Sequence, residues 1–163
     1  MSRASGAVCP GHAALSRGFT LVEVIATAAI IMTVAALAIP GYANALESAR
    51  IVRAIADVRA MSDEIMAYRI DTGDVPDSLA ELGRDGHRDP WGNPYVYLKF
   101  DAGGEGGAKG ARKDKWLTPL NSFYDLYSKG PDGETELPLT ARSSWDDIIV
   151  AGDGLFVGVA EDF

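Results

Sequence analysis

Five carboxylates crowd into one polar stretch, residues 130–147, where Arg142 is the only basic residue. They belong to Asp132, Glu134, Glu136, Asp146 and Asp147. Ca²⁺ takes about 6 to 8 oxygen ligands from carboxylates and loop carbonyls and tolerates irregular geometry, so such a stretch suits a hard cation. The alternating acids of an EF-hand loop are absent from it. The competing interpretation is ordinary solvated charge, with Asp146 and Asp147 capping a short helix or strand that runs through Val150.

A lone acid, Glu23, stands in the most apolar part of the chain. All other positions of residues 19–39 hold Phe, Leu, Val, Ile, Ala, Met or Thr. The run matches the ~20 residues that a helix needs to cross a bilayer. A charged side chain at the centre of such a helix costs ~2.5 to 3.5 kcal/mol on insertion scales. The carboxylate of Glu23 therefore needs a partner, or an interfacial position from which it reaches the headgroups.

Residues suited to catalysis are scarce. Beyond residue 18 the chain holds one histidine, His87, and no cysteine, and it contains neither Gly-x-Ser-x-Gly nor His-Glu-x-x-His. The glycine-rich residues 101–115 form no P-loop because no Gly-Lys pair occurs in the chain. We expect a solvated hairpin loop or a basic contact patch there, with Lys109, Arg112, Lys113 and Lys115 as its cations. With 23 acids against 15 bases, a protein that coats nucleic acid is disfavoured as well. We therefore expect neither an enzyme nor direct nucleic-acid binding.

The flanks of the apolar run indicate its orientation. Residues 1–18 carry Arg3 and Arg17 and no acid, so the positive-inside rule keeps them in the cytoplasm and exports the C-terminal bulk. No Ala-x-Ala site ends the run, as it would in an ordinary secretory signal. After Pro40, residues at helical spacing form an apolar stripe, namely Ile51, Ile55, Val58, Ser62 and Ile65. We expect one helix over residues 19–68, perturbed near Pro40 and Gly41.

The remaining elements predict an α+β fold. Runs rich in aromatic and β-branched residues predict strands at 95–100, 123–128 and 155–159, which would form a small antiparallel sheet packed on the helix. Residues 77–83 read as a capped helical turn, with Asp77 as N-cap and Gly83 as C-cap. The expected organisation is a leader over residues 1–18, a membrane helix over 19–39 and an exported head over 40–163.

Residues 17–23, Arg-Gly-Phe-Thr-Leu-Val-Glu, resemble the processing motif of type IV prepilins and type II secretion pseudopilins. In that family a membrane peptidase cuts after the glycine and methylates the new amino terminus. The resemblance therefore implies cleavage between Gly18 and Phe19 and loss of the leader, and Pro40 matches a proline common in these proteins. The amine of Phe19 would stay basic after methylation, so it could pair with Glu23 of a neighbouring subunit and offset the cost of burying that acid.

The resemblance continues into the head. Residues 88–95 (Arg-Asp-Pro-Trp-Gly-Asn-Pro-Tyr) and 125–133 (Asp-Leu-Tyr-Ser-Lys-Gly-Pro-Asp-Gly) resemble segments of major, G-type pseudopilins. It implies a type IV pilin-like fold with a long C-terminal loop. It also implies a calcium site in that loop, with Asp132, Asp146 and Asp147 as the matching ligands, although the spacer between Asp132 and Asp146 is longer than usual.

The function implied is that of a structural subunit of a periplasmic pseudopilus, which supports protein export by a type II secretion system. The implied partners are further copies of the chain in a filament, minor pseudopilins, the prepilin peptidase, and an inner-membrane assembly platform with its ATPase. The subunit would wait in the inner membrane, with a cytoplasmic N-terminus, before it joins the filament. The alternatives are a type IV pilus subunit in adhesion, motility or DNA uptake, and a membrane-anchored binding module.

Overall fold

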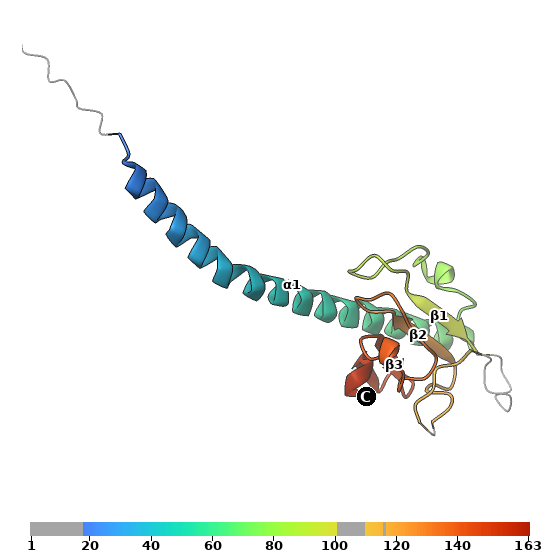
Figure 1. Ribbon diagram of the computed structural model, residues 1–163. Coiled ribbons are helices and arrows are strands. Elements are labelled where there is room, and N and C mark those ends of the chain that lie inside the picture. The colour runs from blue at the N-terminus through green and yellow to red at the C-terminus, as the bar shows by residue number, and fades with distance from the viewer. Residues whose placement is uncertain (1–17, 101–109, 116) are drawn as a thin grey trace, which may run out of the picture. The chain divides into compact units, whose positions relative to one another are not determined.

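The computed structural model describes residues 18–100, 110–115 and 117–163. One long helix, α1 (Leu21–Thr72), precedes an antiparallel sheet with strand order β1-β2-β3-β4 (Figure 1). The strands are β1 (Val96–Lys99), β2 (Tyr124–Ser128), β3 (Ile148–Ala151) and β4 (Phe156–Val159). Three short 3₁₀ turns lie at Leu79–Leu82, Arg142–Ser144 and Ala160–Asp162. The α+β class expected from the sequence is confirmed.

The chain divides into two compact units, Met1–Tyr42 and Ala43–Phe163, and we call the second one the head unit. In the first unit most helical residues are apolar and exposed, and no residue in the most apolar window of α1 is buried. This part of α1 is long and apolar enough to cross a membrane. The helix continues through Pro40 and ends at Thr72, four residues beyond the predicted end at Tyr68.

In the head unit, α1 packs against the sheet with the face that the helical spacing predicted. Val58, Ser62 and Ile65 are buried, and Ala54 and Met61 join them. These side chains form one apolar core with members from the strands, including Tyr124, Leu126, Ile148 and Val150. Burial of this stripe is what holds the helix on the sheet.

A second core lies on β3 and includes Ile149 and Ala151 with Leu120, Leu139 and Ala160. Because successive side chains of a strand point to opposite faces, Ile148 and Val150 face one core while Ile149 and Ala151 face the other. All four residues of β3 are therefore buried. β3 was not among the predicted strands, because a strand buried on both faces has no alternation of apolar and polar residues. Only the competing interpretation of the acidic stretch placed a short helix or strand through Val150.

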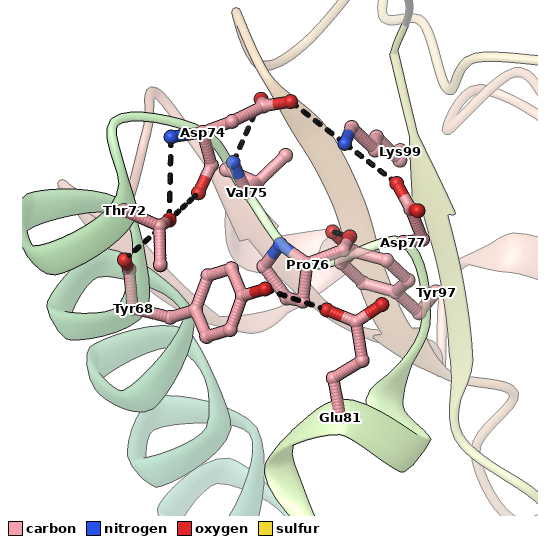
Figure 2. Close-up of polar contacts among 9 residues, drawn as sticks. All are labelled: Tyr68, Thr72, Asp74, Val75, Pro76, Asp77, Glu81, Tyr97 and Lys99. Carbon is pink, nitrogen blue, oxygen red and sulfur yellow. Dashed lines mark hydrogen bonds and ion pairs between the residues drawn. The ribbon is translucent and has the colours of Figure 1, made fainter.

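Polar contacts link the end of α1 to the edge strand β1 (Figure 2). The ammonium of Lys99, on β1, donates to Asp74 Oδ2 at 2.8 Å and to Asp77 Oδ1 at 2.7 Å. These hydrogen bonds lower the pKa of the Asp74 carboxyl and raise that of Lys99. Asp77 thus binds Lys99 and does not cap the following turn, whose N-cap residue is Ser78 without a side-chain cap bond. Gly83, with φ of 68°, ends that turn as predicted.

The same corner is fixed by two tyrosines. The hydroxyl of Tyr97 donates to the carbonyl of Pro76 at 2.6 Å, and that of Tyr68 donates to Glu81 Oε2 at 2.8 Å (Figure 2). Tyr68 lies on α1 and Tyr97 on β1, so both elements hold the connecting segment. The chain therefore leaves the helix along a defined path to the sheet.

Ser62 and Tyr124 provide a test of how α1 is held. Their hydroxyls share a buried hydrogen bond of 2.8 Å between the helix and β2. Tyr124→Phe leaves the Ser62 hydroxyl buried without this partner, so we expect a loss of about 1 to 3 kcal/mol in the free energy of unfolding. The double variant Tyr124→Phe/Ser62→Ala should recover part of that loss because no orphaned hydroxyl remains. Urea unfolding of the full chain in detergent measures both, and equal stability of wild type and Tyr124→Phe would contradict the expectation.

Candidate functional site

The junction between Gly18 and Phe19 lies directly before α1. Both residues are exposed and outside the helix, and Phe19 exposes 81% of its surface. A side chain built on Gly18 would meet no atom within 4 Å. The junction is therefore an accessible, non-helical segment, which suits cleavage by a peptidase. The other residues of the predicted leader, including Arg17, lie outside the described residues.

Glu23 lies in the first turn of α1. Its backbone N–H donates to Thr20 Oγ1 at 3.2 Å, which makes Thr20 the cap of the helix and Glu23 the acid three residues later. A negative charge at this position stabilises a helix by about 0.3 to 1 kcal/mol through the helix dipole. Within residues 18–100, 110–115 and 117–163, no basic side chain forms an ion pair with Glu23. The negative charge of Glu23 therefore has a local role at the start of the helix.

The two head segments that carry the resemblance contact each other. The carboxylate of Asp89 accepts the backbone N–H groups of Trp91 and Asn93 at 3.1 and 2.8 Å, which closes the turn. Its second oxygen accepts the hydroxyl of Ser128, the last residue of β2, at 2.6 Å. Asn93 in turn donates to the carbonyl of Gly130 at 3.1 Å. The turn at Asp89 and Pro90 is thus hydrogen-bonded to the end of β2 and to the start of the acidic segment 130–147, which it holds in place.

The turn is also tied to the helix through Trp91. Its indole N–H donates to Glu47 Oε1 at 2.7 Å, and the guanidinium of Arg50 pairs with the other oxygen of Glu47 at 3.3 Å. Glu47 and Arg50 lie on α1 within the head unit. The turn therefore connects the helix on one side with the acidic segment on the other.

Asp132 and Asp146 come together in the acidic segment. The backbone N–H of Asp132 donates to Asp146 Oδ2 at 3.3 Å, and Asp132 Oδ1 accepts the N–H of Glu134 at 2.8 Å. Both acids line an open depression together with Glu134, Arg142 and Glu161. Burial raises the pKa of the Asp146 carboxyl above its usual range, and the hydrogen bond from Asp132 opposes this rise.

Asp147 has different surroundings. It is fully buried, and its Oδ2 accepts from the Arg112 guanidinium at 2.6 Å and from the Thr135 hydroxyl at 2.6 Å. Burial raises the pKa of Asp147 to about 6, although Arg112 acts in the opposite direction. Asp146 lies in the turn before β3, and its carboxylate meets Asp132 instead of Arg112. Asp147 is therefore not grouped with Asp132 and Asp146.

This geometry offers no ready site for a calcium ion that is bound by Asp132, Asp146 and Asp147 together. Among the residues that the structure describes, no group of three or more His, Cys, Asp or Glu side chains could hold a metal ion. Asp147 does not fit the predicted ligand set because its Oδ2 already binds a guanidinium. Asp132 and Asp146 do lie together, so calcium stays a prediction for that pair and the carbonyls of its loop.

Arg112 is the functional residue that the sequence analysis misplaced. It was expected to lie in a solvated hairpin loop or a basic contact patch, but its side chain is only 2% exposed. Of the other cations in that cluster, Lys109 lies outside the described residues. No local signal distinguishes Arg112 from its neighbours Lys113 and Lys115, because its partner Asp147 is 35 residues away in the chain. Only the pairing of distant segments identifies it.

Comparison with known proteins supplies the family. The chain is 31% identical over 139 residues to the type II secretion system core protein G of Escherichia coli (strain K12), covering 72% of this chain and 83% of that one. It is 28% identical over 138 residues to the protein of the same name from Pseudomonas aeruginosa, covering 72% and 84% of the two chains. The Aeromonas hydrophila protein of that name matches at 28% identity, covering 72% and 84%. No family model matched, and no solved structure gave a significant match.

Gly130 tests how closely the two ends of the acidic segment, at residues 130 and 146, pack against each other. A Cβ on Gly130 would clash with the backbone carbonyl oxygen of Asp146, and the φ of Gly130 is 66°. Gly83 has nearly the same φ, 68°, but open space around it. Both Gly→Ala variants carry the backbone strain, so we expect Gly130→Ala to lose about 1 to 3 kcal/mol more than Gly83→Ala through overpacking. Urea unfolding monitored by tryptophan fluorescence measures the difference, and equal losses would show that the two ends of the segment are not packed together.

Proposed function

We propose, because the chain belongs to the family of the type II secretion system core protein G, that it is a structural subunit of a periplasmic pseudopilus that supports protein export. The match to the Escherichia coli protein carries this conclusion, since it spans most of that relative and most of this chain. The α+β layout and the long N-terminal helix agree with it. The role is structural and requires no catalytic site.

The chain would divide into three parts that lie in different compartments. Residues 1–18 would be a cytoplasmic leader that a prepilin peptidase removes. Residues 19–39 would cross the inner membrane as a single helix, which is supported by the exposed, apolar surface of α1. Residues 40–163, including the amphipathic half of α1, would lie in the periplasm, as the basic leader indicates.

Assembly would use the same apolar helix a second time. Once the subunit leaves the membrane, its exposed side chains need a new apolar environment, and other copies of the helix provide one. Glu23 would then pair with the amine of Phe19 from a neighbouring copy, which offsets the cost of burying both charges and sets the register between subunits. An inner-membrane platform, its ATPase and minor pseudopilins are the partners that such a filament needs.

The alternative, a type IV pilus subunit, is not favoured, because the relatives from Escherichia coli, Pseudomonas aeruginosa and Aeromonas hydrophila all carry the secretion system name. A membrane-anchored binding module gives no reason for an acid inside the apolar run. Calcium binding by Asp132 and Asp146 would leave this structural role unchanged.

Replacing Glu23 separates assembly from helix capping. Glu23→Gln keeps the length and hydrogen-bonding capacity of the side chain but removes its charge. If the carboxylate pairs with a neighbouring amine, both Glu23→Gln and Glu23→Ala should insert into the membrane normally and fail to form filaments. Loss of one partner of a buried pair costs ~3 to 5 kcal/mol, enough to abolish assembly.

The measurement is the amount of filament released from the periplasm, with the amount in the membrane fraction as the control for insertion. Normal filaments from Glu23→Gln, together with a defect in Glu23→Ala, would assign the acid to helix capping and overturn the pairing.

Processing can be tested at Gly18. The purified mature chain should have the mass of residues 19–163 plus one methyl group, located on the amine of Phe19. Gly18→Leu should block cleavage without disturbing the fold, because a side chain there meets no atom within 4 Å. Gly41→Ala is the control, since Gly41 is equally open and lies beyond the junction. Mass spectrometry measures all three chains, and a mature terminus elsewhere than Phe19 would contradict the assignment.

A further inference from the structure

A buried guanidinium lies where three segments of the head unit meet. Arg112 comes from the segment before β2, Thr135 from the acidic loop after β2, and Asp147 from the position directly before β3. The guanidinium donates to Thr135 Oγ1 at 2.8 Å and to Asp147 Oδ2 at 2.6 Å. Thr135 also donates to that same Asp147 oxygen, at 2.6 Å. The three side chains therefore close a small hydrogen-bonded ring.

The position of Arg112 is fixed by its own backbone. Its N–H donates to Asp125 Oδ2 at 2.6 Å, and its carbonyl accepts the N–H of Leu120 at 3.1 Å. The guanidinium carbon also lies 4.3 Å from the centre of the Tyr127 ring, in cation–π contact. Asp125 and Tyr127 belong to β2, so the cation is presented by the sheet.

The segment around Arg112 also holds the acidic loop through the backbone. Lys113 forms a parallel bridge with Pro138, in which the N–H of Lys113 donates to the carbonyl of Leu137 at 3.1 Å. The N–H of Leu139 donates to the carbonyl of Lys113 at 2.9 Å. The loop is thus fastened beside the point where Arg112 meets Thr135. Removing the guanidinium of Arg112 would therefore affect the contact between its segment and the acidic loop, and not only the side-chain pair with Asp147.

A divalent cation would compete poorly for this place. Asp147 Oδ2 already accepts two donors, and Asp147 Oδ1 is the only carboxylate atom there without a hydrogen-bond partner among the described residues. An ion at Oδ1 would stand beside the positive charge of Arg112, which disfavours it electrostatically. It would also lack Asp132 and Asp146, which are grouped elsewhere.

We propose that the guanidinium of Arg112 is the internal cation that closes the acidic C-terminal segment onto the sheet, in the role for which the family resemblance led us to expect calcium. A buried carboxylate is costly without a partner, and Arg112 supplies both charge and a hydrogen bond, with a second one to Thr135. Closure of the segment is therefore built into the chain and needs no divalent ion. The proposal concerns stability in the isolated chain and does not depend on filament assembly.

The first test uses the wild-type full chain in detergent. Its melting temperature should be the same in excess EGTA and in millimolar CaCl₂, because the closing cation is covalently part of the protein. A melting temperature that falls with EGTA and recovers with CaCl₂ would overturn the proposal. This arm requires no variant and stands even if substitutions prevent folding.

The second test compares two arginines of different surroundings. Arg112→Met removes the buried cation, whereas Arg142→Met removes a more accessible one within the acidic segment. We expect Arg112→Met to melt at a clearly lower temperature than wild type and Arg142→Met to melt close to it. The double variant Arg112→Met/Asp147→Leu should melt above Arg112→Met, since it no longer buries an unpaired carboxylate. Equal melting of the two single variants, or a double variant no more stable than Arg112→Met, would overturn the pairing.

Discussion

The packing of α1 on β2 and β3 is the contact on which the rest of the head depends. Val58 and Ile65 of the helix share a core with Leu126 and Ile148 of the strands. This burial fixes one face of β3 and leaves Ile149 and Ala151 to form a second core on the other face. Because β3 is covered on both sides, the segments before and after it are held in place. Asp147 directly precedes β3, so its burial is a consequence of this arrangement.

Local sequence patterns predicted the helix and strands that bury only one face. Val58, Ser62 and Ile65 recur at helical spacing, and they are the buried face of α1. The predicted strands at 95–100, 123–128 and 155–159 contain β1, β2 and β4. β3 was missed because its four residues are all buried, which removes the alternation that a half-exposed strand shows. Ser62 also fits poorly in an apolar stripe until Tyr124, 62 residues away, is seen to bind it.

The candidate site shows the same division between local and distant information. Gly18, Phe19 and Glu23 are close in sequence, so a motif can identify them and the structure adds their exposure and the cap at Thr20. The acids of the C-terminal segment were grouped by composition and by the family resemblance. Neither source shows that Asp146 and Asp147 have different partners, or that the distant Arg112 binds Asp147 and not Asp146. Such choices depend on which segments the sheet brings together, and no pattern within either segment records them.

Asp147 and Glu23 meet the same physical constraint in different ways. A carboxylate taken out of water needs a cation or several donors nearby, since its desolvation is otherwise uncompensated. Asp147 finds Arg112 and Thr135 within its own chain, so the head is complete as a monomer in this respect. Glu23 finds only the helix start at Thr20, and no cation among the described residues. In a filament subunit this difference is useful. The head can fold and remain folded before assembly, whereas the proposed pairing of Glu23 with the amine of Phe19 from another copy of the chain would supply the cation that the described residues do not.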